Sequence, residues 1–331
     1  MFDLITIGDV VVDTFIPLID FEILDSHETN DKLIALRYGD KIPVGQSTSL
    51  VAGNAANNAV GASRLKLKTA IYTNVGNFGD DENDDRIKAK LKKEKVDIRY
   101  VVETGELPSN HHIVLNYNGE RTILIHHQPW KFNLPDLDRA RWVYLTSLSP
   151  SFVDSPLYDQ LISYLERTNA KLAYNPGTFQ IKLGVKRYPR LLSHTELFVV
   201  NLEESKIILG FDRSENIQVK KLLKGLADLG PRNVVITDGS KGSFGFDGEK
   251  YYKLGIIPAK LVEMTGSGDA FATGTMAGLF YGQSLDKAMR WGAANGASVV
   301  EQVGPQAGLL NLDQMKTKLK TNSKVVAQEL K

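Results

Sequence analysis

The sequence predicts an α/β protein in which a mainly parallel sheet is covered by helices on both faces. The main observation comes from the part of the chain after residue 140, where short apolar runs alternate with longer amphipathic runs. The strand-like runs are 142–146, 171–174, 197–200 and 233–237, and the helix-like runs are 156–167, 203–209 and 216–229. Such alternation is typical of parallel strands joined by helices.

The two ends of the chain continue this pattern. Residues 2–7 form an apolar run closed by Gly8, which predicts a buried first strand, and 69–75 predicts another strand. The remaining helices are predicted at 54–66, 82–95, 269–281, 284–301 and 311–321. With 331 residues, of which 42% are hydrophobic, the chain is long enough to bury a large core.

Two β-rich segments interrupt the pattern. Residues 14–50 are irregular, and 98–127 contains two apolar runs on either side of Asn118-Gly119, a strong hairpin signal. We expect the two segments to pair as a small lid over the carboxyl edge of the sheet, where ligands bind in open α/β folds. The predicted division is a core of 1–13, 46–97 and 131–331, and a lid of 14–45 and 98–130.

Composition excludes several classes of function. The net charge of +1 gives no indication of a nucleic-acid or membrane partner, and no stretch approaches the length of a membrane helix. The absence of cysteine excludes disulfides and thiolate catalysis and fits a cytoplasmic location. The opening residues Met-Phe-Asp-Leu-Ile-Thr-Ile-Gly lack a basic region, so they predict a strand rather than a signal peptide.

Residues 263–274 hold the most informative motif. The turn Thr265-Gly266-Ser267-Gly268 leads into an apolar helix-like segment, with Asp269 at the junction. Backbone N–H groups in such a turn, together with the helix dipole, suit a phosphate group, and a neighbouring carboxylate can accept a proton from a hydroxyl. A glycine-rich helix cap is the alternative. The motif is not a Walker A loop, because no Gly-Lys-Ser/Thr follows.

Polar residues after other predicted strands are further candidates. Asp13, in Gly-Asp-Val-Val-Val-Asp, is placed to accept hydrogen bonds from substrate hydroxyls, or is a simple turn aspartate. The small residues of 52–59 let a ligand approach the backbone, and Asn57 offers both a donor and an acceptor. A tightly packed, capped helix is the alternative here.

Three more groups of candidate residues lie after predicted strands in the second half of the chain or in the predicted lid. Asn201 and Glu204 suit either the hydration shell of Mg²⁺ or plain helix capping. The segment 237–242 suits a nucleotide phosphate or a hairpin turn. The pairs His111-His112 and His126-His127 do not predict a zinc site, because adjacent strand residues point to opposite faces; one histidine facing the substrate is the better interpretation.

In combination and in this order, these elements resemble the ribokinase-like (PfkB) family of sugar and nucleoside kinases, over residues 3 to 310. The family's first signature resembles Ala52-Gly53-Asn54-Ala55-Ala56-Asn57-Asn58-Ala59, and its second resembles Glu263-Met264-Thr265-Gly266-Ser267-Gly268-Asp269-Ala270-Phe271. An Asn-x-x-Glu element matches Asn201 to Glu204, and a Thr-x-Gly-x-x-Gly element matches Thr237, Gly239 and Gly242.

The resemblance implies a three-layer αβα sandwich with a small β lid, and an ATP- and Mg²⁺-dependent kinase. It implies that Asp269 is the catalytic base and that the N–H groups of Gly266, Ser267 and Gly268 form an anion hole. The implied acceptor residues are Asp13, Gly53, Asn54 and Asn57. The implied ATP-site residues are Asn201, Glu204, Thr237, Gly239 and Gly242, with Glu204 holding Mg²⁺ through water.

Several points stay open at this level. Glu263 replaces an aspartate that helps to bind a monovalent cation in many relatives, so K⁺ activation is an open question. The acceptor is a small-molecule pentose or hexose in the first hypothesis and a nucleoside in the second. The second gains weight if the lid aromatics Phe15, Phe21, Tyr38, Tyr117 and Trp130 line the site. A non-catalytic ligand sensor is a third hypothesis, and a homodimer formed through the lid is a further expectation.

Overall fold

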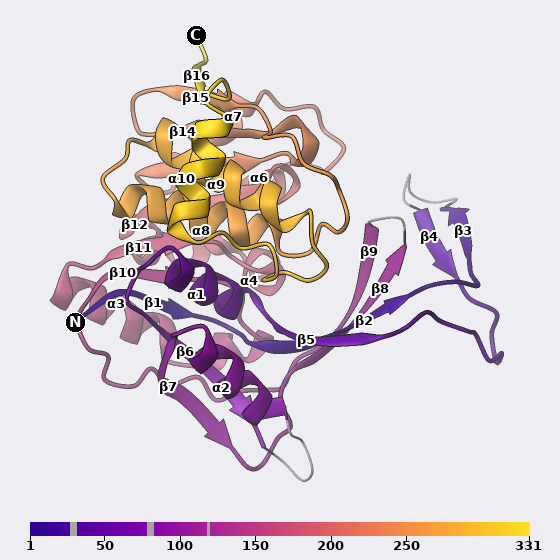
Figure 1. Cartoon of the computed structure of the whole chain (residues 1–331). Coiled ribbons are helices and arrows are strands. Elements are labelled where there is room, and N and C mark those ends of the chain that lie inside the picture. The colour runs from indigo at the N-terminus through magenta and orange to yellow at the C-terminus, as the bar shows by residue number, and fades with distance from the viewer. Residues whose placement is uncertain (27–31, 78–82, 118–119) are drawn as a thin grey trace.

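The computed structural model describes residues 1–26, 32–77, 83–117 and 120–331, and it has the predicted three layers (Figure 1). A ten-stranded sheet runs through the described residues in the order β16-β15-β14-β13-β12-β11-β10-β1-β6-β7. The parallel strands are β1 (Phe2–Ile7), β6 (Thr69–Gly76), β7 (Asp97–Thr104), β10 (Ala140–Leu145), β11 (Lys171–Tyr174), β12 (Thr195–Asn201) and β13 (Asn233–Thr237). The fold class predicted from the sequence is therefore confirmed.

One edge of the large sheet is antiparallel, which the sequence pattern did not indicate. The strands β14 (Ser243–Phe246), β15 (Tyr251–Leu254) and β16 (Gln328–Glu329) follow β13 in turn. A short 3₁₀ turn (Gly239–Lys241) connects β13 to β14, so the segment 237–242 does lie in a hairpin connection.

Helices cover both faces of the sheet because neighbouring residues of each strand point to opposite sides. Leu4 packs with Phe271 and Met276 on one face, whereas Ile5 packs with Leu161 and other residues on the opposite face. The first face carries α1 (Asn54–Arg64), α2 (Asn83–Lys93), α8 (Ser267–Phe280), α9 (Leu285–Val299) and α10 (Leu312–Thr321). The second carries α3 (Leu157–Thr168), α4 (Thr178–Leu183), α5 (Pro189–Ser193), α6 (Leu202–Leu209) and α7 (Val219–Ala227).

A four-stranded sheet stands off this core, as Figure 1 shows. Its order is β5-β2-β8-β9, from β2 (Val11–Pro17), β5 (Thr48–Ala52), β8 (His111–Tyr117) and β9 (Glu120–His126). The two β-rich segments therefore pair with each other, through the parallel strands β2 and β8. A separate two-stranded ribbon consists of β3 (Glu22–Asp25) and β4 (Lys32–Ala35).

The boundaries of the lid differ from those expected at 14–45 and 98–130. β7 pairs with β6 in the large sheet. β2 begins at Val11 and β5 ends at Ala52, so the small sheet also contains residues that were expected in the core. Composition could not assign these strands to the core or to the lid, because strand-forming residues do not indicate which sheet a strand joins. The strands of the predicted hairpin pair as expected, with Tyr117 opposite Glu120, and its turn Asn118-Gly119 lies outside the described residues.

Candidate active site

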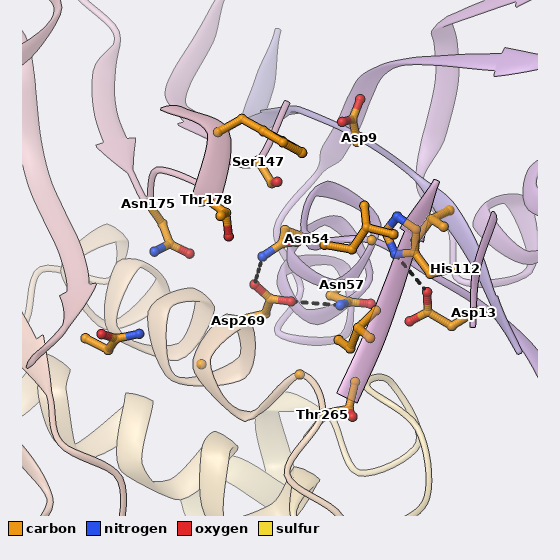
Figure 2. A pocket seen from close by; sticks show the side chains of 18 of the residues that line it. Asp9, Asp13, Asn54, Asn57, His112, Ser147, Asn175, Thr178, Thr265 and Asp269 are labelled. Atoms are coloured by element: carbon orange, nitrogen blue, oxygen red, sulfur yellow. Dashed lines mark hydrogen bonds and ion pairs between the residues drawn. The ribbon is translucent and has the colours of Figure 1, made fainter. Parts of the chain in front are cut away.

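A cavity of about 370 Å³ lies where the lid meets the carboxyl ends of the parallel strands. Its lining brings together residues from the strand ends, the lid and the N-termini of α1, α4, α6 and α8. Of the residues expected from the sequence, the lining includes Asp13, Gly53, Asn54, Asn57, Asn201, Glu204, Thr237, Gly266, Gly268 and Asp269. Figure 2 shows Asp269 between Asn54 and Asn57, with Asp13 and His112 on one side and Asn175 and Thr178 on the other.

Asp269 occupies the first turn of α8 and is held by two amide side chains. Asn54 donates from Nδ2 to Oδ1 at 2.9 Å, and Asn57 donates from Nδ2 to Oδ2 at 2.8 Å. Burial raises the pKa of Asp269 to about 6, although the hydrogen bonds from Asn57 and Asn54 and the charge of Arg121 all lower it. A carboxylate with this pKa is ionised at pH 7 and remains basic enough to accept a proton.

Asn57 is itself held in one orientation. Gln306 donates from Nε2 to Asn57 Oδ1 at 3.0 Å, which turns the Asn57 amide nitrogen towards Asp269. Gln306 is only 4% exposed. The neighbouring Asn58 donates to the Asn54 carbonyl at 2.6 Å and accepts a hydrogen bond from Thr273. The amides that the resemblance assigned to the acceptor therefore also form a network around the carboxylate.

The turn before α8 presents backbone N–H groups to the cavity. Gly266 is the residue before the helix and has a φ of 79°, a left-handed conformation that favours glycine. Within the described chain, the amides of Gly266 and Gly268 have no hydrogen-bond acceptor, whereas Ser267 donates to the Met264 carbonyl at 3.2 Å. Ser267 Oγ donates to the same carbonyl at 2.8 Å. Two of the three expected anion-hole amides are thus available to a ligand.

Asn201 and Glu204 cap α6 and also line the cavity. Asn201 Oδ1 accepts from the Glu204 backbone at 2.8 Å, and Glu204 Oε2 accepts from the Asn201 backbone at 2.8 Å. The two residues therefore do cap the helix, and this capping leaves Glu204 Oε1 for other contacts. Burial raises the pKa of Glu204, with the nearby charges of Glu203 and Asp269 acting in the same direction. In the Thr-x-Gly-x-x-Gly element, Thr237 lines the cavity, whereas Gly239 and Gly242 lie in the turn after β13.

Glu263 is almost fully buried behind the turn. Its Oε2 accepts from the Gly304 backbone at 2.8 Å, and its Oε1 has no hydrogen-bond partner among the described residues. The described residues contain no group of three histidine, aspartate or glutamate side chains placed to hold a metal ion. Nor does the described part of the chain hold a helix long and apolar enough to cross a bilayer.

Sequence reasoning missed several residues of the cavity. Asp9 and Arg121 line it, together with Asn175, Ser147, Thr178 and Phe179. An alternation in β9 was a usable signal, since Arg121, Ile123, Ile125 and the following His127 are spaced by two and share one face. One histidine was expected to face the substrate, and His112 and His127, one from each pair, both line the cavity.

The solved structures that this chain resembles define its fold class. Arabidopsis thaliana ribokinase, complexed with ribose and ATP, matches with a TM-score of 0.77 and 21% identity, over 96% of this chain and 98% of that one. The Methanocaldococcus jannaschii nucleoside kinase, an archaeal member of the ribokinase family, matches with a TM-score of 0.76 and 19% identity, over 97% and 99% of the two chains. The chain therefore has the fold of the ribokinase-like kinases.

Sequence comparison gives the family. The model of the pfkB family carbohydrate kinases matches residues 14–312, and this chain belongs to that family. The ATP-dependent 6-phosphofructokinase of Thermoanaerobacterium thermosaccharolyticum is 22% identical over 329 residues, 96% of this chain and 93% of the relative. The 5-dehydro-2-deoxygluconokinase of Shouchella clausii is 26% identical over 290 residues, 81% and 86% of the two chains. The protein is a phosphotransferase that acts on hydroxyl groups.

Proposed function

We propose that this protein transfers the γ-phosphoryl group of ATP to a hydroxyl group of a sugar, a pentose or a hexose. The observation that carries the proposal is the environment of Asp269. Its carboxylate is buried, is held by Asn54 and Asn57, and shares the first turn of α8 with two unpartnered amides. Asp269 removes the proton from the acceptor hydroxyl, and the amides of Gly266 and Gly268 stabilise the charge that develops on the transferred group.

The cavity residues fit a Mg²⁺ ion that keeps most of its own water. Glu204 offers one free carboxylate oxygen beside Asn201, and Mg²⁺ is usually held by one or two carboxylates together with substrate phosphates. When bound, the ion neutralises phosphate charge. Glu204 and Asn201 would orient its waters, and Thr237 would line the nucleotide side. The unpartnered Oε1 of Glu263 is consistent with a K⁺ site behind the turn, which stays a prediction.

A sugar is favoured over a nucleoside by where the lid aromatics lie. Phe15 and Trp130 are buried, Phe21 packs edge-to-face on Tyr117 at 4.6 Å, and Tyr38 is fully exposed. Among the described residues none of these five lines the cavity, so they offer no stacking platform for a base. The relatives include ribokinases, an adenosine kinase and a cytidine kinase, so nucleosides belong in the test.

Two smaller expectations accompany this proposal. Ile113, Tyr117 and Leu124 of the lid are exposed and apolar, and they support a homodimer formed through the lid. A cytoplasmic location stays a prediction.

The direct test is ADP release by the purified protein with ATP and Mg²⁺, measured with a panel of pentoses, hexoses and nucleosides. We expect one uncharged sugar to raise the rate of ADP release well above the rate without acceptor, and mass spectrometry to find its phosphate ester. If a nucleoside is the best acceptor, the hypothesis of a nucleoside acceptor replaces that of a sugar. Binding without any transfer would favour the ligand sensor.

A further inference from the structure

Two aspartates at the lid side of the cavity are each paired with a histidine. Asp13 of β2 lies directly opposite His112 of β8 in the parallel pairing, and His112 Nδ1 is 3.4 Å from Asp13 Oδ1. Asp9 follows β1, and its Oδ2 is 3.3 Å from His127 Nδ1. Ser149 Oγ donates to the same Asp9 oxygen at 2.9 Å and lies 3.2 Å from His127 Nδ1.

These pairs keep polar atoms without a partner although they are buried. Asp9 is 4% exposed and Asp13 is 5% exposed, and both line the cavity. Asp9 Oδ1 and His112 Nε2 have no hydrogen-bond partner among the described residues, and Asp13 Oδ1 has only the 3.4 Å contact with His112 and no hydrogen bond. Buried polar atoms are rarely left unpaired, so these atoms are expected to meet a ligand or water.

The unpaired carboxylate oxygens of Asp9 and Asp13 only accept hydrogen bonds, and His112 Nε2 can exchange a hydrogen bond with a hydroxyl in either direction. Hydroxyl groups are the donors that match such atoms without adding charge. A phosphate or carboxylate group would bring further acceptors and further negative charge to the same place.

The distribution of charge in the cavity points the same way. The lining holds the carboxylates of Asp9, Asp13, Asp269 and Glu204, and Arg121 is the only lysine or arginine among the described residues that line it. The charge of Arg121 lowers the pKa of Asp269, so this cation acts on the Asp269 carboxylate.

We infer that Asp9, Asp13, His112 and His127 form an acceptor subsite that takes an uncharged, hydroxyl-rich part of the substrate and rejects phosphate or carboxylate groups there. The inference rests on the proposed function, and it names the chemical class of acceptor within it. The ring of His127 packs edge-to-face on Phe179 at 5.3 Å and on His112 at 5.0 Å. These contacts hold the His127 ring beside the cavity.

The test compares matched ligands by titration calorimetry, in the presence of Mg²⁺ and a non-hydrolysable ATP analogue. The pairs are ribose with ribose 5-phosphate, fructose with fructose 6-phosphate, and glucose with gluconate. In at least one pair we expect the uncharged member to bind roughly 100-fold more tightly than the charged member. An anionic group donates no hydrogen bond, so the acceptor atoms of the subsite would remain without a partner when it binds. If no uncharged sugar binds more tightly than its charged counterpart, the inference is overturned.

Variants tie the selectivity to the subsite. We expect Asp9→Asn and, separately, His127→Gln to raise the KM or Kd of the uncharged sugar about tenfold. Each variant should also reduce the difference in affinity between the uncharged sugar and its charged counterpart. Asp136→Asn is the matched control, because its side chain is 95% exposed and lies outside the cavity lining. Circular dichroism checks that each variant is folded. Unchanged selectivity in both folded subsite variants also overturns the inference.

The two proposals can fail separately. Selective binding of an uncharged sugar without ADP release would leave the subsite intact and remove the kinase proposal. Transfer to a phosphate-bearing sugar that is at least as efficient as transfer to any uncharged sugar would keep the kinase proposal and remove the subsite.

Discussion

The cavity holds two groups of aspartates, Asp269 in the first turn of α8 and Asp9 with Asp13 on the lid side, and we call these groups its two ends. At the Asp269 end, both carboxylate oxygens accept hydrogen bonds, and Gln306 orients one of the two donors. At the other end, each aspartate keeps an oxygen that has no hydrogen-bond partner among the described residues. The two ends are similarly buried, so exposure does not explain the difference.

The difference separates residues that act on the substrate from residues that recognise it. A carboxylate whose two oxygens both accept hydrogen bonds holds its geometry before any ligand binds, which is what a group that must be aligned for proton transfer requires. A buried, unsatisfied acceptor costs about 1–3 kcal/mol, and a ligand that supplies the missing donor recovers this free energy on binding. Substitutions at the satisfied end should therefore change turnover, and substitutions at the unsatisfied end should change affinity.

The largest expected effect is that of Asp269→Asn. Removing the base should lower turnover by about 100- to 10,000-fold, while the affinity for a non-hydrolysable ATP analogue stays within about threefold. ADP release and calorimetry measure the two quantities. Asp286→Asn is the matched control, because Asp286 occupies the first turn of the neighbouring helix α9, away from the cavity. Unchanged turnover in Asp269→Asn would remove Asp269 from its role and break the comparison.

Much of the fold could be predicted from the sequence because each parallel strand and its helix carry a local pattern. The runs 2–7, 171–174 and 233–237 match β1, β11 and β13 at both ends. Pairing between distant strands has no local pattern. For this reason β7 was grouped with the lid, and the antiparallel strands β14, β15 and β16 were not expected.

The same limit applies to the cavity. Asp269 and its turn are contiguous in sequence, so a motif could indicate them. Gln306 is 249 positions from Asn57, and Asp9 is more than 100 positions from His127, so only the folded chain brings each pair together. Asn54 and Asn57 were expected to hold the acceptor, and the structure adds that their amide nitrogens donate to Asp269.

The second prediction separates backbone chemistry from packing at the Asp269 end. A Cβ at Gly268 would meet no atom within 4 Å and would occupy the space beside the unpartnered amides. A Cβ at Gly266 would lie 2.4 Å from Pro305 Cβ, at a φ of 79°. Gly268→Ala should keep the melting temperature, since alanine suits a helix, and should lower turnover about 10- to 1,000-fold. Gly266→Ala should also lower the free energy of unfolding, by about 1–3 kcal/mol.

Thermal denaturation and ADP release distinguish these two variants. A large loss of stability in Gly268→Ala would mean that the turn is structural rather than a phosphate site. Full activity of that variant would mean that no reacting group approaches the two amides.

The smallest expected effect concerns Gln306, which does not line the cavity. In the wild type, kcat/KM should fall as the pH drops through about 6, because Asp269 becomes protonated and can no longer act as a base. The Asn57 hydrogen bond lowers the pKa of Asp269, and Gln306 keeps the Asn57 amide nitrogen in place for it. Gln306→Leu should therefore raise this pKa, so that the acidic limb of the profile moves to higher pH.

At pH 6 Gln306→Leu should be several-fold less active than the wild type, and most of the activity should return at pH 8. A variant that merely weakened the fold would lose activity at both pH values. Gln302→Leu, on the exposed loop just before Gln306, controls for the change of residue type. If the acidic limb of Gln306→Leu coincides with that of the wild type, the Asp269 carboxylate does not depend on this network, and the contrast between the two ends of the cavity loses its physical basis.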